Sequence, residues 1–207
     1  GLDFPRSPGR LGDKIYERWR AARVSPACEI DYAAMALAQH YGLPSHGLDV
    51  TEDLTVATWF ATHAYRAGDD GLADYTRLRA EDWPSNPTDW PVVAMLQPVT
   101  WSLRGSLQDC HGLDAFGLAA LRPERQKARF FLGGHADHQN RLAEALVCVA
   151  RLAPGDYSSA LSFEHLFPSP DDDPAYRVML GFANYRPFWK SGALRVARFR
   201  RWLPNKQ

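Results

Sequence analysis

Apolar residues recur with a helical period between Ser25 and Gly42. Ser25 has the hydroxyl that an N-cap needs, and the ring of Pro26 suits the first helical position. The apolar positions that follow are Ile30, Ala33, Ala34, Leu37 and Ala38. We expect this helix to end at Gly42, because glycine is favoured just beyond a helix end. Residues 11–23 show a shorter helical pattern of the same kind.

A strand-to-helix junction is predicted directly after this helix. Residues 46–50 are expected to be extended, and Thr51 to be the N-cap of a third helix, because Glu52 and Asp53 suit the positive end of its dipole. We expect Gly68 to end this helix, and we interpret Trp59 and Phe60 as core residues. The residues of its apolar face are Leu54, Ala57, Phe60, Ala61 and Ala64.

The rest of the chain mixes short strands with helices. Strands are predicted at three short apolar runs, residues 92–96, 129–132 and 145–152. Helices are predicted within 109–121, around 162–166 and from Pro174 onward, where Asp171, Asp172 and Asp173 mark a helix start. Residues 69–89 are polar and contain Pro84 and Pro87, so we expect a long surface loop or insertion. The pattern favours one α+β domain over residues 1–207, with short central strands flanked by helices.

Composition narrows the function classes. The chain has 24 Lys and Arg against 24 Asp and Glu, so no global attraction to nucleic acid or an anionic membrane is expected. No apolar run is long enough to span a bilayer. Cys28, Cys110 and Cys148 are widely spaced and are expected to be buried thiols in a reduced cytoplasm. His135 and His138 lack a supporting carboxylate or cysteine, so no metal is expected.

The run from Gln39 to Ala61 resembles the FRG domain family of bacterial proteins. That family typically shows Gln-His-(Tyr or His)-Gly-Leu-Pro-Thr-Arg-Leu-Leu-Asp-Trp-Thr, followed by a helix that ends Ala-x-x-Phe-Ala. Here Ser45, His46, Gly47 and Val50 replace the usual Thr, Arg, Leu and Trp. The matching residues are Gln39, His40, Tyr41, Gly42, Leu43, Pro44, Leu48, Asp49, Thr51, Ala57, Phe60 and Ala61.

Two further runs support the resemblance, which spans roughly residues 25–180. The family pattern Arg-x-x-x-Gln-x-Gly-x-Phe is matched by Arg122, Gln126 and Phe130, with Ala128 in place of the glycine. Residues 166–175 are similar to the family's Leu-Phe-Pro-Asp-Leu element. The (Phe or Tyr)-Arg-Gly motif that names the family is not found in the chain; either it lies upstream of Gly1 or this copy has lost it.

The resemblance implies a function. The layout of strand, threonine and helix is similar to an element of ADP-ribosyltransferases, which implies NAD as substrate and an unknown macromolecular target. By that analogy Gln126 and His40 are the candidate catalytic residues. Such a protein would act as a toxin or in antiviral (phage) defence. The candidate ligand-binding residues are Gln39, Tyr41, His46, Asp49, Thr51 and Arg122.

Other roles for these residues stay open. Thr51 can be only a helix cap, Asp49 can bond loop amides, and His40 can simply complement the dipole at a helix end. The domain can be a non-catalytic binding module or a degenerate structural one. Residues 185–207 carry seven Lys or Arg and no acid among aromatic residues, so they can bind nucleic acid or simply pack as a terminal strand or helix.

Overall fold

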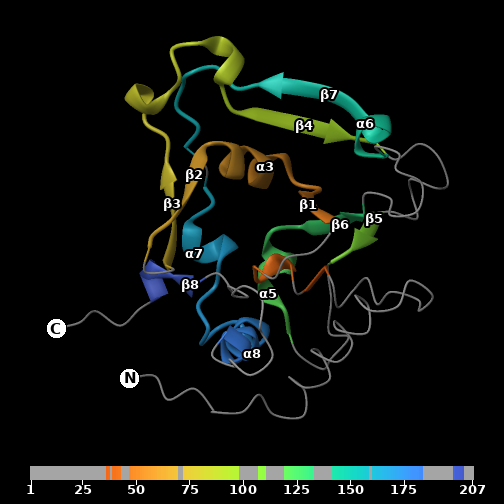
Figure 1. Ribbon diagram of the computed structural model, residues 1–207, viewed down its shortest axis with the longest axis vertical. Coiled ribbons are helices and arrows are strands. Elements are labelled where there is room, and N and C mark those ends of the chain that lie inside the picture. The colour runs from red at the N-terminus through yellow and green to blue at the C-terminus, as the bar shows by residue number, and fades with distance from the viewer. Residues whose placement is uncertain are drawn as a thin grey trace.

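The computed structural model describes residues 36–37, 39–42, 47–69, 72–97, 107–110, 119–132, 141–158, 160–183 and 198–202 of the chain. Helices and short strands are interspersed along it, which confirms the predicted α+β class (Figure 1). The strands form three small sheets rather than one large sheet. Within the described residues, no helix is long and apolar enough to cross a membrane. The helices predicted within 11–23 and over most of 109–121 lie outside the described residues.

The first sheet brings the two family motifs together. Its strand order is β1 (Gly47–Thr51), β6 (Ala128–Leu132) and β5 (Leu107–Asp109), and all pairs are antiparallel. The register sets Asp49 opposite Phe130. A Cβ atom added to Gly47 would lie 2.0 Å from the ring of Phe130, which is fully buried. Any larger residue at the start of β1 would therefore have to displace this ring.

The third helix is shorter than predicted. Helix α3 spans Leu54–Ala61, and its N-cap is Asp53, whose carboxylate accepts hydrogen bonds from the next helical amides. The prediction that Thr51 is the cap was wrong, because Thr51 is still paired with Ala128 in the sheet. The helix also ends before Gly68, since its last turn closes at Thr62. Trp59 is buried, as predicted, whereas Leu54 is 69% exposed.

The second sheet lies where helix and loop were predicted. Strand β2 (His63–Ala67) forms a hairpin with β3 (Leu72–Arg77). Strand β2 lies where the third helix was expected to continue to Gly68, and β3 lies inside the segment 69–89 that was predicted as a loop. Two short 3₁₀ turns, η1 (Ala80–Asp82) and η2 (Pro87–Asp89), complete that segment. Strand β8 (Arg198–Phe199) pairs in parallel with β3 and is followed by η4 (Arg200–Trp202).

The third sheet is a two-stranded ribbon at the top of Figure 1, above α3. Strands β4 (Val92–Leu96) and β7 (Leu146–Arg151) are antiparallel, and α6 (Arg141–Ala145) leads into β7. Both strands were predicted, but every residue of β7 is exposed. Cys148 is exposed too, so the prediction of buried thiols fails there, although Cys110 is buried.

Three helices and an aromatic core connect the sheets. Helix α5 spans Leu121–Arg125, α7 spans Phe163–Leu166 with Ser162 as its cap, and α8 spans Pro174–Ala183. The last two confirm the predicted helices. The aromatic rings in the core belong to Tyr41, Trp59, Phe163, Phe167, Tyr176 and Phe199. Strand β1, helix α3, the turn after α5 and α7 therefore approach one another around this core.

Candidate functional site

A buried carboxylate joins three separate segments at the base of the site. The Tyr41 hydroxyl donates a 2.6 Å hydrogen bond to Oδ2 of Asp173, which also accepts from the backbone amide of Arg122. Oδ1 of Asp173 accepts from the amide of Tyr176 in the first turn of α8. Asp173 is fully buried, and the three donors compensate the loss of water. Burial, together with the nearby Asp173 charge, raises the pKa of Tyr41, which therefore stays a hydroxyl donor.

The guanidinium of Arg122 is buried among aromatic rings. Its side chain is among the largest that are fully buried, and its Nη1 donates a 2.9 Å hydrogen bond to the His40 carbonyl. The guanidinium carbon lies 4.6 Å from the Tyr41 ring centre and 4.4 Å from that of Tyr176. Such cation–π contacts stabilise a cation that water does not reach. Arg122 therefore fixes the end of the helix that stops at Gly42, where His40 and Tyr41 lie.

Gln126 connects the second motif to the first. Its side-chain amide donates a 2.9 Å hydrogen bond to the Leu166 carbonyl in α7, and its own carbonyl accepts one of 2.7 Å from the Thr51 hydroxyl. Thr51 also accepts from the amide of Asp53, so this hydroxyl joins β1, α3 and the turn after α5. In that turn Lys127 has a positive φ of 46°, which lets the chain reverse into β6.

The exposed edge of the site is formed by Gln39, His40 and Asp49. The Gln39 side-chain nitrogen donates a 2.9 Å hydrogen bond to Oδ1 of Asp49. Nε2 of His40 lies 3.6 Å from the same oxygen, which is too long for a hydrogen bond. This nitrogen is buried and has no hydrogen-bond partner among the described residues. The Asp49 side chain, in contrast, is 40% exposed.

The pKa values of His40 and Asp49 are shifted in opposite directions, so that the carboxyl holds its proton to a higher pH than the imidazole does. Burial and the Arg122 charge lower the pKa of His40 to about 4, although its contact with the Gln126 side chain opposes the shift. Partial burial raises the pKa of Asp49 to about 7, against the effect of the Gln39 hydrogen bond. At neutral pH the imidazole is therefore uncharged, and the carboxyl exchanges its proton readily. A carboxyl with a pKa near 7 can act as acid or base in that range.

The structure brings together nearly all the residues that the motifs singled out. Gln39, His40, Tyr41 and Arg122 are linked by the contacts above, and Asp49, Thr51 and Gln126 adjoin them. His46 lies outside the described residues. Whether these residues act on a ligand stays a prediction.

Sequence reasoning missed the part that Asp173 plays. The acidic run before Pro174 was interpreted only as a helix start, and Asp173 does receive an amide of α8. Its bonds to Tyr41 and to the amide of Arg122 come from residues far away in the chain. The one available signal was its place in the third family run, residues 166–175.

The basic C-terminal segment is only partly described. Among residues 198–202, Phe199 packs in the core and Arg201 donates to Glu164. This packing fits a terminal strand, which was one of the two alternatives for the segment. Binding of nucleic acid through residues 185–207 stays a prediction.

Comparison with protein families identifies the junction. The family model of the FRG domain matches residues 10–70, which include the helix end at Gly42, strand β1 and helix α3. Comparisons with curated proteins and with solved structures gave no match. The match over residues 10–70 agrees with the resemblance that the motif at Gln39–Ala61 predicted.

Proposed function

We propose that the edge formed by Gln39, His40 and Asp49 binds NAD and promotes cleavage of its bond to nicotinamide. The ADP-ribose would pass to water or to a hydroxyl of a macromolecular target. The observation that carries the proposal is the buried Nε2 of His40, which has no hydrogen-bond partner within the described part of the chain and lies beside the partly exposed carboxyl of Asp49. A buried polar atom without a partner is uncommon, and a ligand group that bonds to it would remove the cost.

Asp49 is suited to the proton transfer in this reaction. The bond between C1′ of the ribose and the nicotinamide nitrogen breaks, and its electron pair leaves with neutral nicotinamide. An oxygen of water or of the target bonds to C1′, and its proton passes to the Asp49 carboxylate. A base whose pKa is about 7 is partly ionised at neutral pH and can accept that proton.

His40 and Gln126 have different parts in this scheme. The His40 ring is uncharged at neutral pH, and in the tautomer whose proton is on Nδ1 its Nε2 accepts a hydrogen bond from a ribose hydroxyl. Gln126 is buried and bonded to the Leu166 carbonyl, and its side chain also contacts His40. We therefore assign Gln126 to positioning the imidazole rather than to the ribose itself. Such an activity would suit an effector of the toxin or phage-defence type.

The test is incubation of the protein with labelled NAD, with chromatographic detection of nicotinamide and of modified protein. Asp49→Asn should lower the rate roughly a hundredfold or more, because a general base contributes on that order. The wild-type rate should rise with pH up to about 7, as Asp49 loses its proton. Glu52→Gln is the matched control, because this nearby carboxylate pairs with Arg129 outside the site.

Two results would contradict the proposal in different ways. NAD binding without nicotinamide release would favour a non-catalytic binding module. Neither binding nor release by the wild-type protein would remove NAD as the ligand and favour a structural FRG domain.

A further inference from the structure

A pocket of about 340 Å³ lies against the aromatic core. It is bordered by α3, the β2–β3 hairpin and the segment that enters α7, and none of the site residues described above lines it. Its volume falls within the range of small-ligand sites. The residues that matter for its chemistry are Tyr75, Arg77, Tyr157, Phe163, Glu164 and Arg201.

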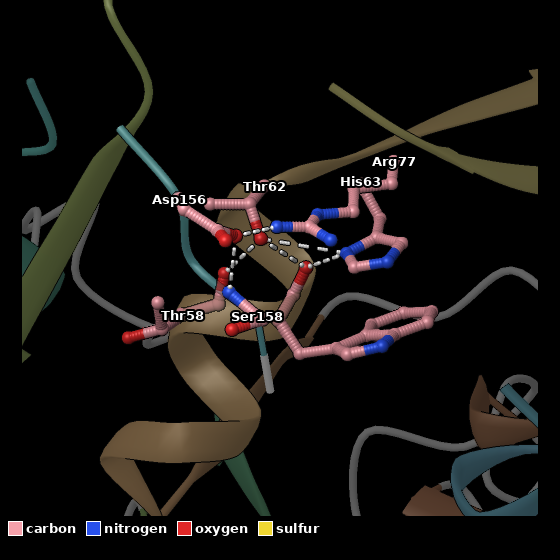
Figure 2. A network of polar contacts seen from close by, with 7 residues as sticks. Thr58, Thr62, His63, Arg77, Asp156 and Ser158 are labelled. Carbon is pink, nitrogen blue, oxygen red and sulfur yellow. Dashed lines mark hydrogen bonds and ion pairs between the residues drawn. The ribbon is translucent and has the colours of Figure 1, made fainter. Parts of the chain in front are cut away.

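The wall of the pocket nearest α3 is rigid. The rings of Trp59 and His63 are stacked, with centres 4.0 Å apart and planes 12° apart. Nδ1 of His63 lies 2.7 Å from the Trp59 carbonyl, which can only accept, so Nδ1 carries the proton (Figure 2). Thr62 fixes the same turn through bonds to the carbonyls of Thr58 and Trp59. The other ring nitrogen of His63 remains an acceptor, and burial lowers the pKa of the ring.

Two arginines line the pocket with donors to spare. Arg77 pairs with Asp156, whose Oδ1 also accepts the Ser158 amide at 3.0 Å (Figure 2). Arg201 donates a 2.6 Å bond to Glu164, and its guanidinium carbon lies 4.7 Å from the Phe163 ring centre. Each guanidinium has five N–H donors, so the carboxylate partner found among the described residues leaves several of them available. Both side chains are nearly half exposed.

Two tyrosine rings that line the pocket, Tyr157 and Tyr75, are each held in place by neighbouring residues. Tyr157 donates from its hydroxyl to the Ala153 carbonyl, and its ring packs against Trp83. The Tyr75 ring also lines the pocket and packs against Phe167, with ring centres 5.0 Å apart. Burial raises the pKa of Tyr75 to about 12, so its hydroxyl stays protonated. Both rings are partly exposed, so a planar group can pack against them.

We propose that this pocket binds a nucleoside monophosphate. The phosphate contacts Arg77 and Arg201, the base packs against the tyrosine rings, and the Glu164 carboxylate accepts from a ribose hydroxyl. Guanidinium groups bind phosphate through parallel hydrogen bonds, and planar bases pack on aromatic rings without regard to sequence. The proposal is independent of the NAD reaction proposed for the FRG site.

The first test is isothermal titration calorimetry of the full chain with adenosine 5′-monophosphate. We expect saturable binding of one equivalent, and weaker binding of adenosine and of inorganic phosphate. Arg77→Gln should weaken binding roughly tenfold to a hundredfold, as loss of hydrogen bonds to a charged group does. Arg79→Gln is the matched control, because this exposed arginine pairs with Glu81 and does not line the pocket.

Asp156→Asn provides a change in the opposite direction. It weakens the competing partner of Arg77, so affinity for adenosine 5′-monophosphate should rise several-fold. Equal binding of adenosine, equal binding of inorganic phosphate, or weaker binding by Asp156→Asn would overturn the proposal.

The two ligand sites are separated by one further variant. Asp49→Asn should bind adenosine 5′-monophosphate with unchanged affinity, because Asp49 does not line this pocket. A loss of binding there would place the nucleotide in the FRG site and would overturn this proposal while supporting the other.

Discussion

The FRG site and the β4–β7 ribbon distribute polarity in opposite ways. In the site, Arg122 and Asp173 are 1% and 0% exposed, whereas in the ribbon Met95 and Val147 are 60% and 58% exposed. The buried charges have aromatic faces and amide donors around them. The apolar side chains of the ribbon belong to a two-stranded sheet, which has little interior of its own. In these two regions, burial therefore follows the partners that the surrounding structure supplies rather than the hydrophobicity of the side chain.

The largest loss of stability is expected when the hydrogen-bond acceptor at the base of the site, Asp173, is removed. Asp173→Ala deletes the acceptor for Tyr41, for the amide of Arg122 and for the amide of Tyr176. Each hydrogen bond to a charged group is worth about 1.5–3 kcal/mol, so we expect a loss of at least about 3 kcal/mol in the free energy of unfolding. Urea denaturation followed by circular dichroism measures it.

Asp172→Ala is the adjacent control. This exposed carboxylate bonds only to Ser169 among the described residues, so the loss should be about 0.5 kcal/mol or less. Equal losses for the two variants would show that the buried cluster is not what stabilises this region.

The second effect concerns pH and separates the two ionisable groups of the site. His40 has a folded pKa near 4, below its usual value of 6.5, so its contribution to stability is complete above 6.5 and is lost as pH falls toward 4. That loss is about 3 kcal/mol at most. Asp49 has a folded pKa near 7, above 3.8, so its contribution is complete below 3.8 and is lost as pH rises toward 7.

The opposed trends should become visible in variants. Relative to wild type, Asp49→Asn should lose more stability on acidification from pH 6.5 to 4.5, and His40→Gln should lose less. Unfolding free energies measured across that range test this. Parallel curves for all three proteins would mean that neither group is perturbed by the fold.

The smallest effect is expected in the ribbon. Val147→Thr should change the unfolding free energy by about 0.5 kcal/mol or less, because an exposed valine has little burial to lose. Thermal denaturation at several protein concentrations measures it. A loss above about 2 kcal/mol would show that the side chain is covered in solution and would remove the contrast between the two regions.

The sequence predicted local features well. Short apolar runs bounded by capping residues or glycine correctly predicted the helix end at Gly42, strand β6 and helix α7. The FRG motif also indicated which residues would lie close together, although they belong to β1, to α5 and to the helix that ends at Gly42. What it could not supply was the burial of Asp173, because its partner Tyr41 lies 132 positions away.

Two further misses have physical causes. The β2–β3 hairpin was not predicted because its strands carry little apolar alternation, and helix and loop patterns were inferred there instead. Thr51 looked like a cap because its hydroxyl does accept the amide of Asp53, yet sheet pairing keeps its backbone extended. In both cases pairing with distant or polar strands overrode the local signal.

The contact between Gly47 and Phe130 makes position 47 sensitive to any added volume. The family pattern has leucine at position 47 and glycine at position 128, whereas this chain has Gly47 and Ala128. Both positions lie in the β1–β6 pair, and a side chain at 47 would overlap the Phe130 ring, which has no exposed surface. A leucine introduced at position 47 alone would have to displace this ring, so β1 and β6 would have to repack together.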